Sequence, residues 1–437
     1  MRRITSGRWS SYLQLWLLVI CIQNITTSSA GKRSLYRFTD ASDVEVLARE
    51  LEFKSADIWK VNRHKREIDF IANPDVARSS LEQNGGELRV LVEDMDALIR
   101  EERAGIHSYR SKRSTSPELD FTKFPSFEEL EDYLHHIAEK HSQFVKLESH
   151  GYTHENRSLY LLKIGQINSR IEKKAMFLDA GIHAREWASV SSMAFIVSRL
   201  VDLFSDPQKM LNDVRSQVNY YIMPLANPDG YEYTRSTDRL WRKNRAPPPE
   251  NSTCYGVDLN RNWNVSGYGV GASDDPCSQI YKGSEPDSEP EVITAKKLIS
   301  SFSDIRHYLG FHSYGSYVLT PFGYTKKLPE DNIRLLKVGH AMREAIYAVN
   351  SRNYSVGSPA HIFYVAGGAS DDYSKLSGIP TSMTIELPEV DGTGFILPSE
   401  SIIDIGKEAW ASLEPAAAQI VEYEDYEVQN SIYVGKN

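Results

Sequence analysis

The 437-residue chain has only 3 cysteines, no excess of basic residues and no long apolar run beyond its N-terminus. A net charge of −9 without a basic stripe argues against a nucleic-acid-binding protein. The lack of a further apolar run that could cross a bilayer argues against a membrane protein. No internal repeat is present, and an apolar content of 41% is ample for a core, so the length predicts two or three domains.

The N-terminus is predicted to be a secretory signal rather than part of the fold. Arginines precede a short apolar stretch at residues 12–22, and small residues follow at 28–30. This order is typical of a signal peptide covering residues 1–30, and it predicts a secreted, extracellular protein. A signal anchor is the alternative, although the apolar stretch is too short to span a bilayer comfortably.

Cysteine usage agrees with secretion. Cys21 lies in the expected signal, which leaves Cys254 and Cys277. Two cysteines in a secreted chain are predicted to form one disulfide, and two unpaired thiols are the alternative. The chain is also expected to be a glycoprotein, because Asn-x-Ser/Thr sequons occur at several positions. These are Asn156, Asn251, Asn264 and Asn353.

The part of the chain that follows the signal is predicted to form a small domain. Apolar and polar residues alternate at 86–93, and helical spacing occurs at 44–53 and 95–103. This pattern favours a few helices packed on an antiparallel sheet, in an α+β open sandwich.

Residues 109–117 are basic and polar and end at a proline, which is typical of an exposed linker. The sequence Arg-Ser-Lys-Arg at 110–113 suits cleavage by a trypsin-like or convertase-like protease. A secreted small domain, a basic cleavage site and a larger domain suggest a zymogen, with a plain hinge as the alternative. The expected boundaries are therefore 1–30 for the signal, 31–113 for the prosegment and 114–437 for the larger domain with its polar C-terminal tail.

The remainder of the chain alternates strand-like and helical runs. This alternation predicts an α/β domain whose mixed, twisted sheet has helices on both faces, and binding sites in such sheets lie beyond the carboxyl ends of strands. Strands are expected at 175–180, 218–223, 308–311, 316–320 and 381–387. Helices are expected at 127–141, 187–204, 289–302, 332–349 and 402–424, with a loosely ordered tail after about residue 423.

Three His-x-x-Glu pairs could each offer two metal ligands. They are His64/Glu67, His136/Glu139 and His183/Glu186. The first lies in a charge run typical of a solvated face, and the second lies on a predicted helix surface. Only the third directly follows a compact apolar run, at 175–181, that predicts a buried strand ending in a glycine turn. Ligation depends on such context, so His183 and Glu186 are the candidates.

His312 and Glu386 complete the candidate site. Both lie at or near the ends of expected strands, so the sheet would bring them to one edge together with His183 and Glu186. Two histidines and one glutamate with an open fourth position make a catalytic rather than a structural Zn²⁺ site. Glu386 would not bind the ion but would accept a proton from the attacking water.

With these residues in place, the chain resembles the zinc metallocarboxypeptidases of the pancreatic A/B type, in their procarboxypeptidase form. The resemblance covers nearly the whole chain after the signal and is looser in the small domain. The motifs are His-Ala-Arg-Glu-Trp at 183–187, Asn-Pro-Asp-Gly-Tyr at 227–231, Arg-Leu-Trp-Arg-Lys at 239–243, Asn-Arg-Asn-Trp at 260–263, His-Ser-Tyr at 312–314 and Glu-Leu at 386–387. Several motifs in the right order are far more specific than any one of them.

The resemblance implies a monomeric enzyme that removes the C-terminal residue from peptides and proteins and uses one Zn²⁺ per chain. It implies that His183, Glu186 and His312 bind the ion. Glu386 would be the general base, and Arg242 would stabilise the tetrahedral oxyanion, an effect often worth about 3 kcal/mol.

The resemblance also implies a clamp for the free carboxylate of the substrate. Asn260, Arg261 and Tyr364 would form it, since a planar guanidinium binds a carboxylate bidentately. Tyr364 precedes two glycines at 367–368, and in this family the tyrosine closes over the substrate.

Further positions follow from the same resemblance. Arg185 and Tyr314 would line the subsites further from the cut. Phe395 would help to pack the cleft. Asp258 would accept a hydrogen bond from His183 and orient its ring.

Asp371 would decide the specificity. It lies seven residues after Tyr364, where B-type members have an aspartate and A-type members an apolar residue. A carboxylate there would pair with a lysine or arginine side chain, so a B-type preference is expected. The alternatives are that Asp371 starts or caps a helix, or that Asp372 points inward, and an A-type preference for aromatic or aliphatic residues is the runner-up.

Two features depart from the family, and two other functions compete. Pro388 replaces a common arginine, the stretch 388–393 differs, and an insertion at 246–250 lengthens a loop beside Arg242. These changes concern packing and access rather than the metal ligands. The rivals are a non-catalytic peptide-binding relative, which would have lost ligands or the base, and a metallohydrolase that acts on esters or amides.

Overall fold

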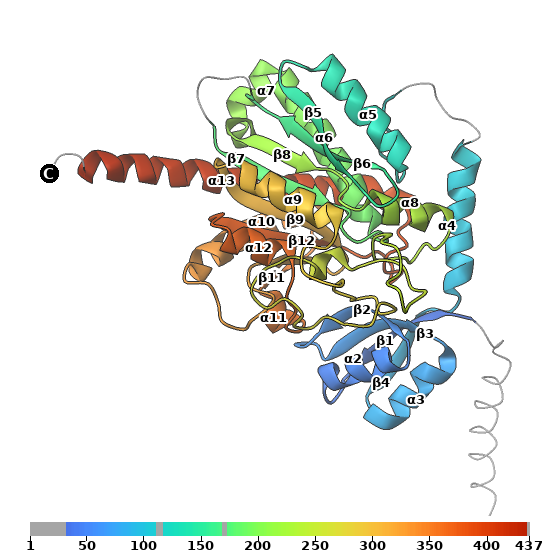
Figure 1. The fold of residues 1–437 in the computed structure, drawn as a ribbon. Helices are drawn as coiled ribbons and strands as arrows, with labels where there is room; N and C mark the ends of the chain where they lie inside the picture. The colour runs from blue at the N-terminus through green and yellow to red at the C-terminus, as the bar shows by residue number, and fades with distance from the viewer. Residues whose placement is uncertain (1–31, 111–116, 168–172, 435–437) are drawn as a thin grey trace, which may run out of the picture.

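The computed structural model describes residues 32–110, 117–167 and 173–434 (Figure 1). The expected signal peptide and the Lys112-Arg113 part of the expected cleavage site lie outside these residues. The strands are β1 (Ser34–Thr39), β2 (Asp57–Asn62), β3 (Glu67–Ala72), β4 (Glu87–Val92), β5 (Val145–Tyr152), β6 (Ser158–Ile164), β7 (Ala175–Ala180), β8 (Asn219–Met223), β9 (Ile305–Ser313), β10 (Tyr317–Leu319), β11 (Ser355–Gly357) and β12 (Thr381–Leu387). The helices are α2 (Val44–Phe53), α3 (Pro74–Asn84), α4 (Met95–Arg110), α5 (Phe127–Lys140), α6 (Trp187–Ser205), α7 (Pro207–Asn212), α8 (Pro228–Ser236), α9 (Pro290–Ser301), α10 (Asn332–Asn350), α11 (Pro359–Ile362), α12 (Ser370–Leu376) and α13 (Ile402–Val434).

The N-terminal domain, from β1 to α4, has a four-stranded antiparallel sheet in the order β2-β3-β1-β4. Phe38 of β1 and Phe70 of β3 pack into a core with α2 and α3. Leu35 and Ile71, from the opposite face of the same strands, pack against the large domain. Successive strand residues point to opposite faces, so one sheet contributes to two cores. This confirms the expected α+β open sandwich.

The large domain is built on an eight-stranded mixed sheet in the order β11-β10-β12-β9-β7-β8-β6-β5. Strands β12, β9, β7 and β8 are parallel to one another, whereas β6 and β10 run antiparallel to the neighbours that join them to this group. The carboxyl ends of the four parallel strands therefore meet at one edge of the sheet, which is where ligands bind in such folds.

Helices cover both faces of the large sheet (Figure 1). Met176 and Leu178 of β7 belong to the core that includes α5, α6, α10 and α13, and Phe177 belongs to the core that includes α9. Strand β7 is therefore buried on both sides, which explains a sequence that is apolar except at Asp179. The expected α/β architecture with helices on both faces is confirmed.

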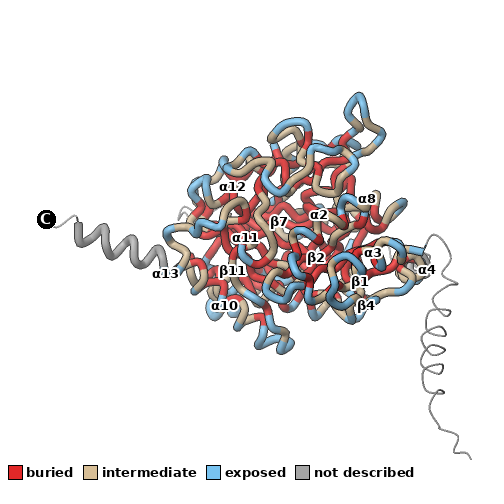
Figure 2. The backbone as a smooth tube through the Cα atoms, turned by 90° about the horizontal axis from the view of Figure 1, so that it is seen from below, coloured by how far each residue is buried: buried red, intermediate tan, exposed pale blue. Residues whose placement is uncertain are grey.

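Helix α6 lies in the larger of these cores. Within the part of the chain that the structure describes, it is the one helix long and apolar enough to cross a membrane, but 67% of its apolar stretch is buried. Figure 2 shows the same distribution for the whole fold, with buried backbone in the centre and exposed backbone in the peripheral turns. Helix α6 thus serves as a core helix.

The predicted elements differ from the structure mainly in length. The strands at 175–180 and 381–387 have the predicted bounds. Strand β9 extends further at both ends because Ile305 pairs with β7 and Ser313 pairs with β12. Helix α4 continues to Arg110, into the expected linker, and α13 continues to Val434 through the tail that was expected to be loosely ordered.

Candidate metal and catalytic site

The first pair of candidate ligands follows directly from β7. Gly181 has φ +68°, and a Cβ there would lie 2.5 Å from Cδ1 of Leu225, so the turn requires glycine. Gly181 N donates to Ser189 Oγ at 3.1 Å, and Ser189 Oγ donates to the carbonyl of Glu186 at 2.7 Å. These bonds fix His183 and Glu186 between the end of a buried strand and the start of α6.

His183, Glu186 and His312 converge at the edge of the sheet. Nδ1 of His183 lies 2.7 Å from Oε1 of Glu186, and Nδ1 of His312 lies 3.1 Å from Oε2 of Glu186. Ser313 N also donates to Oε2 of Glu186 at 3.0 Å. The three side chains are buried, and their ligand atoms lie within 4.8 Å of one another. Two imidazole nitrogens and one carboxylate form a donor set that fits Zn²⁺.

Charge interactions within this group of three shift their pKa values. Burial alone would raise the pKa of Glu186, but His183 and His312 lower it, so its carboxyl is ionised. Burial alone would lower the pKa of His312, but Glu186 raises it to about 9. Burial and then Arg242 lower the pKa of His183. A bound cation requires neutral imidazoles and would replace the protons that Glu186 attracts.

Glu386 lies beside this group on the neighbouring strand. It is the Cα register partner of His312 in the parallel pair of β12 and β9, and paired residues share a face of the sheet. Burial raises the pKa of Glu386 to about 8, with Glu186 and Asp371 acting in the same direction and His312 opposing it. A divalent cation beside the carboxylate would lower that pKa.

Asp258 connects the group to Arg242. Its Oδ1 lies 3.2 Å from Nε2 of His183, and its Oδ2 accepts from Nη2 of Arg242 at 2.9 Å. The side chain is fully buried, yet Arg242 and His183 hold the pKa of Asp258 well below its usual value against the effect of burial. The contact with His183 was expected from the sequence, whereas the shared contact with Arg242 was not.

The three residues expected to hold a carboxylate also lie together. Nη1 of Arg261 donates to the carbonyl of Asn260 at 2.8 Å, and Nη2 of Arg261 lies 3.5 Å from the hydroxyl of Tyr364. Oδ1 of Asn260 accepts from Ser370 N at 3.0 Å, which ties it to the start of α12. Arg261 is largely buried, and its Nε has no hydrogen-bond partner among the described residues.

Asp371 and Asp372 are both buried in the first turn of α12, but they are used differently. The carboxylate of Asp372 accepts from Gly323 N and Tyr324 N, each at 3.0 Å. Oδ1 of Asp371 accepts from the backbone N–H of the next residue, Asp372, at 2.9 Å. Burial is the main cause that raises the pKa of both Asp371 and Asp372, so the shifts do not distinguish the two acids. Backbone amides thus engage Asp372 more completely than Asp371.

The N-terminal domain covers the positions expected to line the outer subsites. Nη1 of Arg185 donates to Oδ2 of Asp57, and the hydroxyl of Tyr314 donates to Oδ2 of Asp69 at 3.2 Å. The ring of Trp59 lies 4.6 Å from that of Phe395. The sequence did not identify Asp57, Trp59 and Asp69. Alternation along their strands indicates that some side chains face away from the small domain's core, but it does not indicate what those side chains contact.

One prediction about the N-terminal domain is wrong. Glu67 was expected on a solvated face, but it begins β3 and is buried at the boundary between the domains. Its Oε1 lies 3.4 Å from Nζ of Lys60 and 3.6 Å from Nε of Arg37. Arg37 in turn donates to Glu389 of the large domain at 3.0 Å, so this charge cluster joins the two domains.

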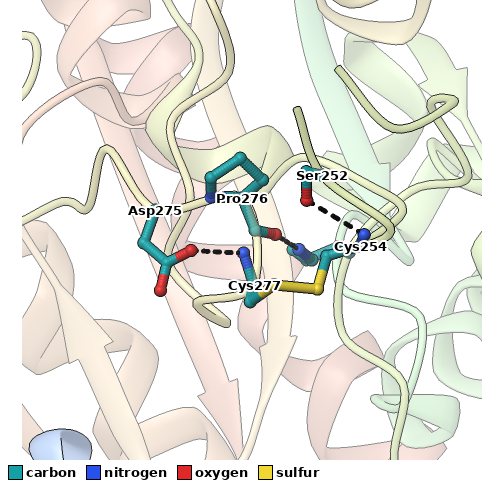
Figure 3. Close-up of a disulfide and its surroundings, with 6 residues drawn as sticks. Ser252, Cys254, Asp275, Pro276 and Cys277 are labelled. Atoms are coloured by element: carbon teal, nitrogen blue, oxygen red, sulfur yellow. Dashed lines mark hydrogen bonds between the residues drawn. A yellow bond between two sulfur atoms is a disulfide. The ribbon is translucent and has the colours of Figure 1, made fainter. Parts of the chain in front are cut away.

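The predicted disulfide is present and lies next to a contact of Lys243, the residue that follows Arg242. Cys254 and Cys277 are bonded, and Figure 3 shows short side chains holding both ends of the bridge. Asp275 Oδ1 accepts from Cys277 N at 2.9 Å, and Ser252 Oγ accepts from Cys254 N at 3.0 Å. Nζ of Lys243 donates to the carbonyl of Pro276 at 2.6 Å, next to the bridge.

Known proteins resemble this chain in sequence and in structure. Residues 130–412 match the family described as zinc carboxypeptidase. The chain is 38% identical over 301 residues to carboxypeptidase B of Astacus astacus, which covers 68% of this chain and 97% of that protein. It is 34% identical over 367 residues to carboxypeptidase A4 of Mus musculus, with 82% and 85% covered. The crystal structure of carboxypeptidase A from Helicoverpa armigera superposes with a TM-score of 0.82 at 28% identity, over 89% of this chain and 97% of that one.

Proposed function

The chain belongs to the zinc carboxypeptidase family and is a peptide hydrolase that uses Zn²⁺, and we propose that it is a secreted zymogen whose mature form removes C-terminal lysine or arginine. The observation that carries the catalytic part is the convergence of His183, Glu186 and His312 with Glu386 beside them. Zinc analysis combined with a peptidase assay of the mature chain tests it.

In this proposal the three ligands hold the ion and the neighbouring side chains do the remaining chemistry. When bound, zinc supplies a Lewis acid that polarises the scissile carbonyl and lowers the pKa of the attacking water. Glu386 accepts the proton of that water and later passes it to the leaving amine. Arg242 stabilises the oxyanion, and Asp258 orients both Arg242 and the ring of His183.

The carboxylate clamp restricts the enzyme to chain ends. Arg261 binds the terminal carboxylate of the substrate, with Asn260 and Tyr364 beside it. An internal peptide bond offers no such carboxylate, and the buried guanidinium would then lack its partner. This argues for peptides with a free C-terminus over the esters or amides of the rival metallohydrolase.

Asp371 sets the preference for a basic residue at the C-terminus. Its burial, and a carboxylate that accepts from fewer backbone amides than that of Asp372, support a role as the anionic floor of the pocket. The runner-up is an A-type preference for aromatic or aliphatic residues. Mature enzyme should cleave a C-terminal Arg substrate faster than its C-terminal Phe counterpart, and faster cleavage of the Phe substrate would reject the B-type assignment.

The N-terminal domain, as a prosegment of residues 31–113, keeps the uncut chain latent. Asp57 and Trp59 contact Arg185 and Phe395, so the domain covers the route by which a peptide would enter. A trypsin-like or convertase-like protease releases it by cutting near Arg113. Controlled trypsin treatment should raise the activity and expose a new N-terminus near Ser114, whereas full activity of the uncut chain would refute latency.

Secretion as a glycosylated monomer completes the proposal. The disulfide suits an oxidising compartment, and all four sequon asparagines are exposed on the surface. Expression in a secreting eukaryotic cell should place the protein in the medium, with a mass that glycosidase treatment lowers. A non-catalytic relative would also be secreted. Peptidase activity that is present in wild type and lost in Glu386→Gln would distinguish an enzyme from such a relative.

A further inference from the structure

A second cluster of potential metal ligands lies at the start of α9, apart from the catalytic one. His154, in the turn between β5 and β6, places Nε2 at 3.0 Å from Oε2 of Glu289. The donor atoms of His154, Glu289 and Glu291 lie within 4.8 Å of one another. The catalytic ligands meet the same limit, and their closest nitrogen and oxygen atoms, on His183 and Glu186, are 2.7 Å apart. The two clusters therefore have similar donors at similar spacing.

Both carboxylates of the second cluster are buried, and that of Glu291 is incompletely paired, whereas Oε1 of Glu289 accepts from Ser288 Oγ at 2.7 Å. Glu289 is 4% and Glu291 is 2% exposed. Nδ2 of Asn244 donates to Oε2 of Glu289 at 2.6 Å and to Oε2 of Glu291 at 3.1 Å. Oε1 of Glu291 has no hydrogen-bond partner among the described residues. A buried carboxylate oxygen without a donor is costly, and the carboxylate that carries it belongs to a group with two further metal-ligating side chains.

The charge of this cluster can be balanced in two ways. Protons on Glu291 and His154 would do so, and burial, with Glu289 acting in the same direction, raises the pKa of Glu291 to about 8. One divalent cation with a neutral His154 balances the same charge and also gives Oε1 of Glu291 a partner. The His154 side chain is 29% exposed, so an ion can reach the cluster from solvent.

We propose that His154, Glu289 and Glu291 form a second Zn²⁺ site. An imidazole nitrogen with two carboxylates suits zinc, whereas Ca²⁺ and Mg²⁺ take oxygen ligands. The side-chain oxygen of Asn244 is not available as a further ligand, because Oδ1 accepts from Val257 N at 2.8 Å.

The second site would stabilise the segments that carry two arginines of the catalytic cleft. Glu289 accepts from Asn244, and its own N–H donates to Oδ1 of Asn262 at 3.1 Å. Asn244 lies two residues after Arg242, and Asn262 directly follows Arg261. The second ion therefore has a structural role, and its loss lowers the thermal stability of the protein.

The test is the zinc content of the full-length chain, measured by atomic emission after saturation with Zn²⁺ and removal of free ion. Wild type should hold two ions, and Glu291→Gln and His154→Gln should each hold one. His154 is partly exposed, so His154→Gln should fold even if Glu291→Gln disturbs the core. Glu155→Gln is the matched control, since this neighbouring acid pairs with Arg157 instead and the variant should keep two ions.

Thermal unfolding gives a readout independent of counting. Zinc beyond the first equivalent should raise the Tm of wild type and Glu155→Gln but not of the Glu291 and His154 variants. A wild-type chain with one ion overturns the proposal, as does a zinc content that is unchanged in both cluster variants or lowered equally in the control. Tighter binding of Ca²⁺ than of Zn²⁺ at this cluster would overturn the choice of metal.

Discussion

Arg185 of the large domain and Asp57 of the N-terminal domain form a hydrogen-bonded ion pair, with Nη1 and Oδ2 at 2.5 Å. Arg185 is 1% exposed, and its guanidinium also lies 4.5 Å from the centroid of the Phe395 ring. A charge-assisted bond to a buried arginine is strong because water cannot replace the partner easily. The pair therefore holds β2 of the N-terminal domain in contact with the residues of the proposed outer subsites.

Asp57→Asn in the uncut chain should raise its basal peptidase activity about 10- to 100-fold, because a hydrogen bond to a charged group contributes about 1.5–3 kcal/mol. The measurement is the rate of hydrolysis of a C-terminal Arg substrate before any proteolytic cleavage. Mature enzyme prepared from both chains should be equally active, since cleavage removes residue 57. Equal basal rates would show that this ion pair does not maintain latency.

Glu386→Gln should lower kcat of the mature enzyme by about 10²–10⁴, the usual contribution of a general base. The glutamine keeps the shape of the side chain, so zinc content and Tm should stay near wild type. Glu400→Gln, at an exposed acid of the same domain, should leave kcat unchanged. Activity that survives in the Glu386 variant would remove this residue from the mechanism.

Asp371→Asn should lower kcat/KM for a C-terminal Arg substrate by about 100-fold or more, because it leaves a buried substrate cation without its partner. The value for a C-terminal Phe substrate should change little or rise.

Asp372→Asn provides the contrast at the adjacent acid. Its carboxylate binds two backbone amides, so the variant should lower Tm and affect both substrates to a similar extent. If the Asp372 variant lost its selectivity for Arg and the Asp371 variant kept it, Asp372 rather than Asp371 would be the acid of the specificity pocket.

Replacing Cys254 and Cys277 by serine together should lower the free energy of unfolding by about 3 kcal/mol, since the bridge closes a loop with a sequence separation of 23. The measurement is urea unfolding under conditions that keep the wild-type bridge oxidised. Reductant should destabilise wild type by a similar amount and leave the double variant unaffected. A double variant as stable as wild type would mean that the loop is held without the bridge.

His307 should make the protein less stable at acid pH. It is fully buried in β9, and both ring nitrogens lack a hydrogen-bond partner among the described residues. Burial, followed by Arg334, lowers its pKa from 6.5 to about 3. The unfolded chain therefore binds the proton first, so the contribution to stability is complete above pH 6.5 and declines as the pH falls toward 3.

His307→Leu should flatten this acid limb. Each pH unit below 6.5 changes the free energy of unfolding by about 1.4 kcal/mol for such a group. The decrease in the free energy of unfolding from pH 7 to pH 5, measured by urea unfolding, should therefore be about 2 kcal/mol larger for wild type than for the variant. His340→Leu, at an exposed position of α10, is the control and should retain the wild-type slope. An unchanged slope in the His307 variant would refute the assignment.

The ligand-bearing strands could be predicted from the sequence because their signals are local. Buried parallel strands are rich in apolar residues, and the run before His183 is of this kind, with Asp179 as its one polar residue, whereas the strand that ends after Glu386 alternates polar and apolar residues. Their common edge follows from the rule that carboxyl ends of parallel strands meet. The disulfide followed from the count of cysteines.

Contacts that depend on how distant segments meet could not be predicted. Trp59 and Asp57 lie on an ordinary strand, and no local pattern indicates that they cover Phe395 and Arg185. Asp371 and Asp372 are chemically identical neighbours that differ only in the amides contributed by another loop. The basic composition of the segment before Pro117 resembled a linker, yet α4 continues to Arg110 because no proline or glycine interrupts its last turn.

The register of β9 against β12 has a consequence for altering this enzyme. Because the backbone ladder places Glu386 opposite His312, the position of the base does not depend on the surrounding loops. Segments such as 246–250 and 388–393 can then be redesigned to change access and side-chain preference while the chemistry is preserved. A one-residue deletion within β12 would have the opposite result, turning the carboxylate to the far side of the sheet and abolishing turnover in a protein that could still fold.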